Sequence, residues 1–311
     1  MIPQTKQKST LPTLLLLLVA IIFGSGYSVA QYLLNCGFNY ATILLAQFSI
    51  AALMIALAFF KVLRREMRLW MIKGGLALGG ILFLALFSQT MGLDLSTPSN
   101  NAFILSSNVV LVPFLWWIVT KHRPKKIVFA ASFLCLIGLI ILSIDYGAGF
   151  VLGYGDLLSF LAAILFATHI VVTDILAKKM DYRVLVFLQF FGATLCALAA
   201  FIITGGTRSI PNIFAAGNTV GALSALLFMS IFQTYLCFFL QTFAQKFIAS
   251  SKAAILLSTE SVFATLFSLV IGYDSLRWQM LVGGTLICMA VVLPKWAEVH
   301  GKKKLSKSDS S

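Results

Sequence analysis

The chain of 311 residues is 60% hydrophobic and only 11% charged, and it carries a formal net charge of +13. Soluble domains carry about 25% charged residues, so this composition excludes a water-soluble globular protein. The basic residues form short clusters between apolar runs, which is typical of membrane anchors and argues against nucleic acid as a partner. The lipid bilayer is therefore the first partner that the sequence predicts.

Long apolar runs follow one another along the whole chain, each close to the 20 residues that a helix needs to cross hydrocarbon. The first run begins at Leu11, after Lys6 and Lys8, and it is longer than the apolar part of a signal peptide, so we interpret it as a span. The runs lack the alternation of barrel strands and are predicted to be helices. In chain order, the predicted spans lie near residues 11–34, 40–60, 74–93, 99–120, 127–144, 156–177, 184–203, 219–244, 253–272 and 278–294.

The distribution of basic residues predicts the orientation of these spans. If the N-terminus lies inside, all 23 Lys and Arg residues except Arg208 and Arg277 fall at the inner ends of the spans. Lys and Arg accumulate on the cytoplasmic side of membrane proteins. We therefore predict a multi-pass protein of the cell membrane, most simply a bacterial inner membrane, with both termini in the cytoplasm.

The two halves of the sequence resemble each other. Residues 40–48 align with 182–190, and residues 99–107 lie without gaps on 250–258. Because five spans is an odd number, the second half starts on the opposite side of the membrane. The predicted fold is an all-α membrane protein whose ten transmembrane helices form two inverted five-helix repeats. The repeats cover residues 1–149 and 150–297, and a cytoplasmic tail covers 298–311. Inverted repeats are typical of secondary transporters.

Several short motifs resemble those of the EamA family, which belongs to the drug/metabolite transporter superfamily. Leu257-Ser-Thr-Glu260-Ser-Val-Phe-Ala264 is similar to the family's Leu-Ser-Leu-Glu-Pro-Val-Phe-Ala, and Phe23-Gly24-Ser25 resembles its Trp-Gly-Ser. Met91-Gly92-Leu93, Asn101-Ala102-Phe103 and Val110-Leu-Val-Pro113 resemble further motifs of the first half. The resemblance implies a ten-helix bundle with a central cavity that usually exports small metabolites.

The sequence departs from the family pattern at three positions. Ser261 replaces a Pro, Asp274 replaces a Glu, and Gln47 stands where an Arg is frequent. An anion-binding role borrowed from that Arg is therefore not carried over to this chain.

Two ionisable residues lie deep in predicted spans, where a charge is costly and functional roles are frequent. Glu260 is the first candidate for substrate binding or for coupling to protons. Its alternative is a structural or gating role with bonds to neighbouring hydroxyl groups or a helix end. His169 lies at a similar depth and could face Glu260 as a relay or substrate pair. A hydrogen bond to a carbonyl group or to Thr173 is the simpler interpretation.

Neutral polar residues provide the remaining candidates. Asn108, Tyr235, Gln233 and Tyr27 either line the cavity or form hydrogen bonds between helices. Gln47 and Gln189 are repeat equivalents, so we predict that they share a structural role near the pseudo-two-fold axis. Asp174 and Lys178 have the spacing of an ion pair at one helix end, and the glycine pairs at 74–75 and 79–80 indicate close helix packing.

The sequence contains no HExxH, GxSxG or GxxxxGK[ST] motif. We therefore expect neither an enzyme nor a bound metal or cofactor. The predicted function is a secondary transporter that exports or exchanges small organic metabolites, such as amino acids or related solutes, or drugs, by alternating access. Its partners would be the small-molecule substrate, the bilayer, and either protons or a counter-substrate. A non-transporting receptor or regulatory protein is the alternative, and an intramembrane enzyme is less favoured.

Overall fold

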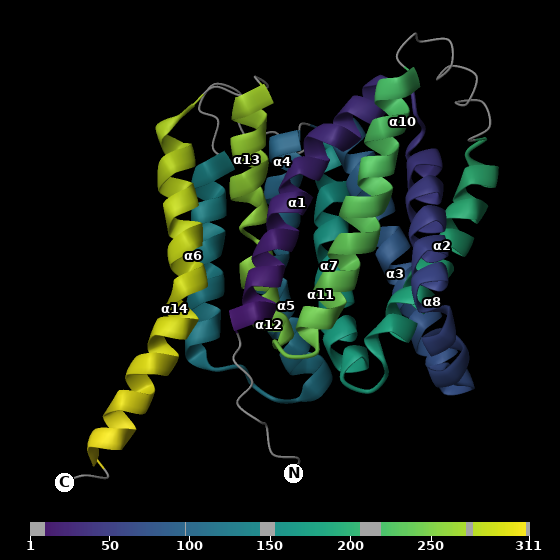
Figure 1. The fold of residues 1–311 in the computed structure, drawn as a ribbon. Helices are drawn as coiled ribbons and strands as arrows, with labels where there is room; N and C mark the ends of the chain where they lie inside the picture. Colours follow the sequence, from purple (N-terminus) through teal and green to yellow (C-terminus); the bar gives the residue numbers. More distant parts are fainter. Residues whose placement is uncertain (1–9, 97, 144–152, 206–218, 272–275, 309–311) are drawn as a thin grey trace.

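A computed structural model describes residues 10–96, 98–143, 153–205, 219–271 and 276–308, and within these ranges all regular structure is helical (Figure 1). In chain order the helices are α1 (Thr10–Asn35), α2 (Tyr40–Glu66), α3 (Leu69–Asp94), α4 (Pro98–Ser106), α5 (Asn108–Thr120), α6 (Lys126–Ser143), α7 (Tyr154–Ala177), α8 (Tyr182–Ile203), α10 (Thr219–Phe228), the π-helical η2 (Met229–Leu236), α11 (Cys237–Gln245), α12 (Ser250–Leu257), α13 (Glu260–Ile271) and α14 (Trp278–Ser308).

Eight helical runs in the described ranges are long and apolar enough to cross a membrane, which makes the chain a multi-pass membrane protein. They are Thr10–Asn35, Tyr40–Glu66, Leu69–Asp94, Asn101–Thr120, Tyr154–Ala177, Tyr182–Ile203, Thr219–Gln245 and Ser250–Ile271. Each corresponds to one predicted span. The remaining two predicted spans correspond to shorter apolar helices at Lys126–Ile141 and Trp278–Pro294. The helical backbone of α14 continues beyond this apolar part, into the segment predicted as a tail.

Three of the predicted spans are divided into two or more helical segments, and we call them the non-uniform helical runs. The span near 99–120 changes from α4 to α5 at Ser107, the span near 253–272 changes from α12 to α13 at Ser258 and Thr259, and the span near 219–244 contains η2. Hydropathy does not detect such changes, because Ser and Thr interrupt an apolar run only weakly. Their hydroxyl groups can nevertheless bond to preceding carbonyl groups and compete with the helix. Ser258 Oγ donates to the Ala254 carbonyl oxygen at 2.8 Å, and Thr259 Oγ1 to that of Leu256 at 2.7 Å.

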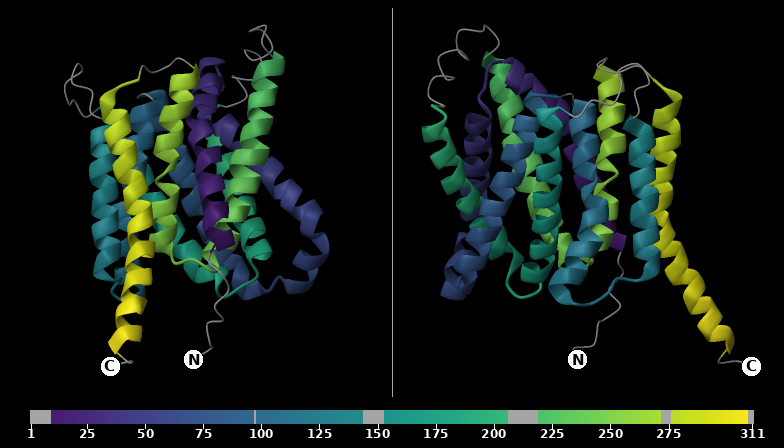
Figure 2. Two further views of the ribbon diagram at one scale, coloured as in Figure 1. Left: turned by 60° about the vertical axis from the view of Figure 1, so that its left-hand side comes forward. Right: turned by 180° about the vertical axis from the view of Figure 1, so that it is seen from behind.

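The connections that carry most of the basic residues lie at one end of the bundle. In Figures 1 and 2 the α2–α3, α5–α6, α7–α8 and α11–α12 connections all lie at the lower end. The start of α1 and the end of α14 lie at the same end. We refer to it below as the basic end.

The bundle depends on close contacts between helices from the two halves of the sequence. α3 packs against α7 and α8, α2 against α8, α1 against α13, and α6 against α14. A Cβ atom on Gly79 of α3 would lie 2.8 Å from the backbone nitrogen of Ala193 in α8. Only glycine allows the two helix backbones to approach this closely, as is common between helices in membranes.

Replacing Gly79 by Ala is expected to destabilise the protein by about 1–3 kcal/mol, because the added methyl group must push α8 away from α3. Gly80→Ala is the matched control, since no atom lies within 4 Å of a Cβ atom at that position. Thermal unfolding of the purified protein in detergent should show a lower Tm for Gly79→Ala only. Equal Tm values for the two variants would contradict the packing described here.

Candidate functional site

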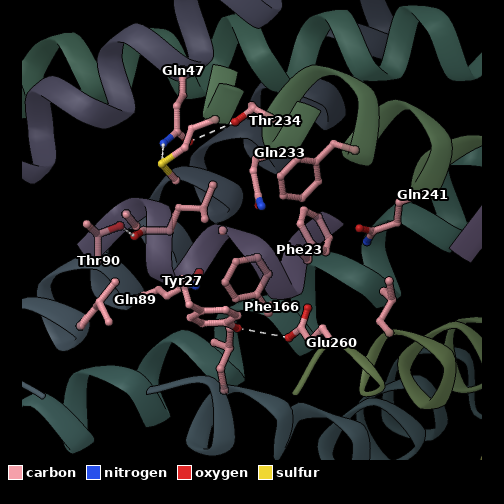
Figure 3. Close-up of a pocket in the computed structure, with 18 of the residues that line it drawn as sticks. Phe23, Tyr27, Gln47, Gln89, Thr90, Phe166, Gln233, Thr234, Gln241 and Glu260 are labelled. Carbon is pink, nitrogen blue, oxygen red and sulfur yellow. Dashed lines mark hydrogen bonds between the residues drawn. The ribbon is translucent and has the colours of Figure 1, made fainter. Parts of the chain in front are cut away.

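An internal cavity lies between α1, α2, α3, α7 and the three non-uniform helical runs (Figure 3). The space open to the centre of a water molecule inside it is about 80 Å³. One water molecule requires only about 10–15 Å³, so the cavity has room for a small organic solute. Its lining consists of Phe23, Gly26, Tyr27, Ala30, Leu44, Gln47, Leu86, Gln89, Thr90, Leu93, Leu105, Asn108, Phe166, Ile170, Met229, Gln233, Thr234, Phe238, Gln241, Leu257, Ser258 and Glu260.

Two glycines of α1 bring this helix close to the other walls of the cavity. A Cβ atom on Gly24 would lie 2.7 Å from the Cβ atom of Phe263 and 2.8 Å from the Ala264 nitrogen, both in α13. A Cβ atom on Gly26 would overlap the side-chain amide of Gln233 in η2. The absence of both atoms lets α1 touch α13 and η2, and the neighbouring Tyr27 therefore reaches the cavity.

The π-helical segment η2 forms the wall opposite α13. Short π-helical segments occur frequently at functional sites. Nε2 of Gln233 donates a hydrogen bond to the carbonyl oxygen of Ile22 in α1. Oγ1 of Thr234 donates to Oε1 of Gln47 in α2 at 3.0 Å. Two consecutive polar residues of η2 thus connect it to two different helices beside the cavity.

Glu260 is the first residue of α13. A carboxylate in the first turn of a helix interacts favourably with the positive end of the helix dipole. The residue is 8% exposed, and its Oε1 accepts a hydrogen bond of 3.3 Å from the hydroxyl group of Tyr27. The carboxyl group therefore lies at the wall of the cavity, next to Tyr27 and close to the ring of Phe166 (Figure 3).

The two interrupted runs, α4–α5 and α12–α13, meet at their interruptions. Ser107 has φ −60° and ψ −14°, and Ser258 has φ −60° and ψ −16°, so the two positions have the same conformation. The hydroxyl groups of Ser106 and Ser261 are hydrogen-bonded to each other, and α4 contacts α13 while α5 contacts α12. The residues that follow the two interruptions, Asn108 and Glu260, both line the cavity.

The structure brings four of the six candidate residues to the cavity: Tyr27, Asn108, Gln233 and Glu260. His169 and Tyr235 do not line it. Nε2 of His169 lies 3.3 Å from Oε1 of Gln189, and the imidazole packs edge-on against Phe238 at 5.7 Å between ring centres. The ring of Tyr235 stacks on Phe239 at 6.1 Å.

The position of His169 differs from both arrangements considered from the sequence. The partner of its Nε2 is Gln189, rather than Glu260, Thr173 or a backbone carbonyl group. Since Phe238 lines the cavity and His169 packs against it, this fully buried histidine lies behind the wall.

Several lining residues escaped the sequence analysis. Gln89 and Thr90 lie near the end of a span, where polar residues usually mark the approach to a loop. Phe23, Phe166 and Phe238 sit in apolar runs, and composition does not distinguish a phenylalanine that faces lipid from one that faces a cavity. Gln47, predicted to have a structural role, also lines the cavity. Gln47 aligns with Gln189 when the two halves of the sequence are compared, and this was a usable signal because a polar residue at both aligned positions is unusual in apolar spans.

No group of three or more His, Cys, Asp or Glu side chains in the described part of the chain could hold a metal ion.

Comparison with known proteins identifies the family of this chain. The model of the EamA-like transporter family matches residues 10–144 and 153–294. The chain belongs to the EamA-like transporter family.

Two further comparisons agree with this assignment. A protein of Archaeoglobus fulgidus named an uncharacterized transporter is 32% identical over 278 residues, which cover 89% of this chain and 83% of the relative. A crystal structure of a protein with 18% sequence identity superposes with a TM-score of 0.72 over 92% of this chain and 96% of the other. The second likeness concerns the fold alone. A membrane transporter of this family requires a small-molecule substrate, and the cavity has room for one.

The hydrogen bond between Thr234 and Gln47 gives a direct test of the cavity wall. Thr234→Val is expected to lower the free energy of unfolding by about 0.6 kcal/mol and at most about 1.7 kcal/mol, the mean and the maximum measured for hydrogen bonds between helices in a membrane protein. Thr168→Val is the matched control, because Thr168 bonds only to the Ile164 carbonyl group of its own helix. Thermal unfolding in detergent should show a lower Tm for Thr234→Val, and a double-mutant cycle with Gln47→Leu should assign the loss to this pair. A cycle without coupling would refute the contact.

Proposed function

We propose that this EamA-like transporter is a secondary transporter that exports or exchanges small organic metabolites by alternating access. The observation that carries the proposal is the cavity with mixed aromatic, amide and carboxyl lining, enclosed by helices from both halves of the chain. Concave sites of this kind, largely apolar with a few polar groups, are typical of small-molecule binding. Transporters place such sites near the bilayer midplane at the interface of their repeats.

The helix contacts support two inverted repeats, divided near residue 150. α1 contacts η2, α11, α12 and α13, and α7 contacts α3, α4 and α5, so the first helix of each half packs against the third and fourth runs of the other. Ser107 and Ser258, the equivalent positions in the gapless alignment, share one conformation. α1 starts at the basic end and α7 ends there, so the two helices run in opposite directions (Figure 1).

In this proposal α6 and α14 are membrane-spanning helices too, and they bring the number of spans to ten. α6 has 18 residues and, at 1.5 Å per residue, a length of about 27 Å, close to the thickness of the hydrocarbon core. The two helices pack against each other, as equivalent fifth helices of a two-fold arrangement would. The positive-inside rule then assigns the basic end, with both termini, to the cytoplasm of a cell membrane.

Alternating access requires a barrier at each end of the cavity. On the basic side, an apolar cluster with Leu16, Val112, Ile248 and Ala253 among its members adjoins the cavity wall at Leu257. On the opposite side, a second cluster adjoins the wall with members from α1, α2, α3, α10 and η2. We infer that these clusters open in turn.

A polar contact holds the barrier at the basic end. Asp174, fully buried at the end of α7, forms the predicted ion pair with Lys178. Its Oδ2 also accepts a hydrogen bond of 3.2 Å from the backbone nitrogen of Ser250, in the first turn of α12. This carboxylate therefore ties the first helix of the second half to the interrupted run that leads to Glu260.

Proteoliposomes that contain the purified protein test the proposed function. Counterflow and gradient-driven uptake should be measured for amino acids, organic amines and nucleobases, each with and without a pH gradient. Saturable flux of at least one solute is expected, and Glu260→Gln should reduce that flux strongly while Glu66→Gln, on an exposed ion pair with Arg65, leaves it unchanged. Binding without flux would replace the proposal by a receptor or regulatory role.

Removing the Asp174 contact is expected to increase the fraction of time for which the cavity is accessible from the basic end. A hydrogen bond to a charged group contributes about 1.5–3 kcal/mol, so Asp174→Asn should raise accessibility from that side by roughly tenfold or more. The readout is the rate at which a membrane-impermeant maleimide modifies Ile170→Cys in inside-out vesicles, with the five native cysteines replaced.

Asp181→Asn is the matched control for this experiment. Asp181 lies at the basic end before α8, where hydrogen bonds from Arg183 hold the pKa of its carboxyl group below the usual range, but no hydrogen bond joins it to α12. The control should leave the modification rate unchanged. An unchanged rate for Asp174→Asn as well would show that Asp174 does not hold the barrier.

A further inference from the structure

The cavity has one carboxyl group in its wall, and no basic side chain lies among the described residues that line it. Glu260 is the only Asp, Glu, Lys, Arg or His among the described residues that line it. The nearby cation Lys178 is paired with Asp174 at the basic end, outside the lining. A solute in this cavity therefore meets a carboxyl group and no compensating base.

The hydroxyl groups of the wall already donate hydrogen bonds within the protein. All four donate to acceptors of the protein: Tyr27 to Glu260, Thr90 to the Leu86 carbonyl, Thr234 to Gln47 and Ser258 to the Ala254 carbonyl. Each of these oxygens can therefore only accept a hydrogen bond from a solute. A carboxylate or phosphate of a solute would find no hydroxyl donor without breaking one of these bonds.

The side chains of Gln233 and Gln241 in the wall are both oriented so that Nε2 donates to a protein acceptor and Oε1 remains available as an acceptor. Nε2 of Gln233 donates to the Ile22 carbonyl oxygen, which fixes the amide group and leaves Oε1 as the acceptor. Nε2 of Gln245 donates to the Ile170 carbonyl oxygen at 2.9 Å, so its Oε1 accepts from Nε2 of Gln241. Oε1 of Gln241 is thereby also left as an acceptor. Backbone carbonyl groups, which only accept, determine both orientations.

Aromatic rings complete the wall. Phe23, Tyr27, Phe166 and Phe238 all line the cavity, and Figure 3 shows Phe23, Tyr27 and Phe166 around the space that Glu260 borders. The face of an aromatic ring is negative and attracts cations within about 6 Å of its centre. The rings also provide the apolar surface that a hydrophobic solute needs.

We propose that the cavity binds solutes with a protonated amine on an aromatic or other apolar body, and that it selects against carboxylates. The ammonium group, which has three donors and no acceptor, would pair with Glu260 and with the carbonyl oxygens of Gln233 and Gln241. The apolar body would lie against the rings. This inference rests on the proposed function for the identity of the cavity as the substrate site. Within the class of small metabolites it favours amines over amino acids, because no basic side chain among the described lining residues would pair with the carboxylate of an amino acid.

Four probes with one phenyl-ethyl body test the charge preference on the full-length protein. They are 2-phenylethylamine (cation), phenylalanine (zwitterion), 2-phenylethanol (neutral) and 3-phenylpropanoate (anion). Equilibrium binding to the purified protein in nanodiscs at neutral pH is measured by calorimetry and by the ligand-induced shift of Tm. The amine should bind about tenfold or more tightly than the alcohol, and the zwitterion and anion more weakly than the amine, as expected for hydrogen bonds to a charged group.

Glu260→Gln assigns the preference to the carboxyl group. This variant should lose about tenfold or more in affinity for the amine and keep its affinity for the alcohol, whereas Glu66→Gln should change neither. The comparison of probes on the unsubstituted protein remains decisive if Glu260→Gln does not fold. Failure of the amine to bind, or binding of the anion or the alcohol as tightly as the amine, overturns the inference.

Binding and flux separate this inference from the proposed function. Selective amine binding without flux in proteoliposomes would leave the charge preference standing and remove the transport proposal. Flux of an organic acid with no preference for the amine would leave transport standing and overturn the charge preference.

Discussion

Inside a lipid bilayer there is no water to satisfy backbone polar groups, so any departure from a regular helix has to find its hydrogen-bond partners within the protein. The runs α4–α5 and α12–α13 depart from the regular helix at Ser107 and at Ser258–Thr259. The structure places these two departures against each other, with the Ser106 and Ser261 hydroxyl groups hydrogen-bonded. The irregular backbone thereby lies inside the bundle and beside the cavity. The position of the cavity follows from this constraint.

The same arrangement determines the chemistry of the cavity. Because a new helix starts at Glu260, its carboxyl group lies at the positive end of the α13 dipole and can be accommodated at membrane depth. The missing side chains of Gly24 and Gly26 let α1 approach closely enough for the Tyr27 hydroxyl group to reach Glu260. Hydroxyl and amide protons are then used in hydrogen bonds within and between helices, and their oxygens remain as acceptors. A wall rich in acceptors is a consequence of how the helices are held together.

The bonds that hold the bundle together also bear on how it could move. At the basic end, the buried Asp174 binds the first turn of α12, and an apolar cluster separates that end from the cavity. α12 leads directly into the interruption and Glu260, so a change at this end has a short covalent path to the proposed substrate site. Packed clusters of this kind have discrete arrangements rather than continuous deformation, as the proposed alternating access requires.

The positions of the helices were determined by the sequence to a large extent. Charge depletion excluded a soluble protein, and eight predicted spans coincide with helical runs long and apolar enough to cross a membrane. Hydropathy succeeds here because lipid imposes the same demand on every residue of a span. Motifs such as Leu257-Ser-Thr-Glu260 and the glycine of Phe23-Gly24-Ser25 led to the family, and the cost of a buried carboxyl group singled out Glu260.

Only the tertiary structure decided which polar residues meet. His169 and Glu260 lie at similar depth by sequence, but depth does not specify which way a side chain faces, and His169 lies with Gln189 behind Phe238. For the same reason, the sequence did not show that Phe166 and Thr90 line the cavity. Hydropathy reports transfer of each residue to lipid, whereas the orientation of an amide group or the meeting of two serines depends on a partner more than 100 residues away in the chain. The sequence therefore determined what can enter the membrane, and helix packing decided what faces the cavity.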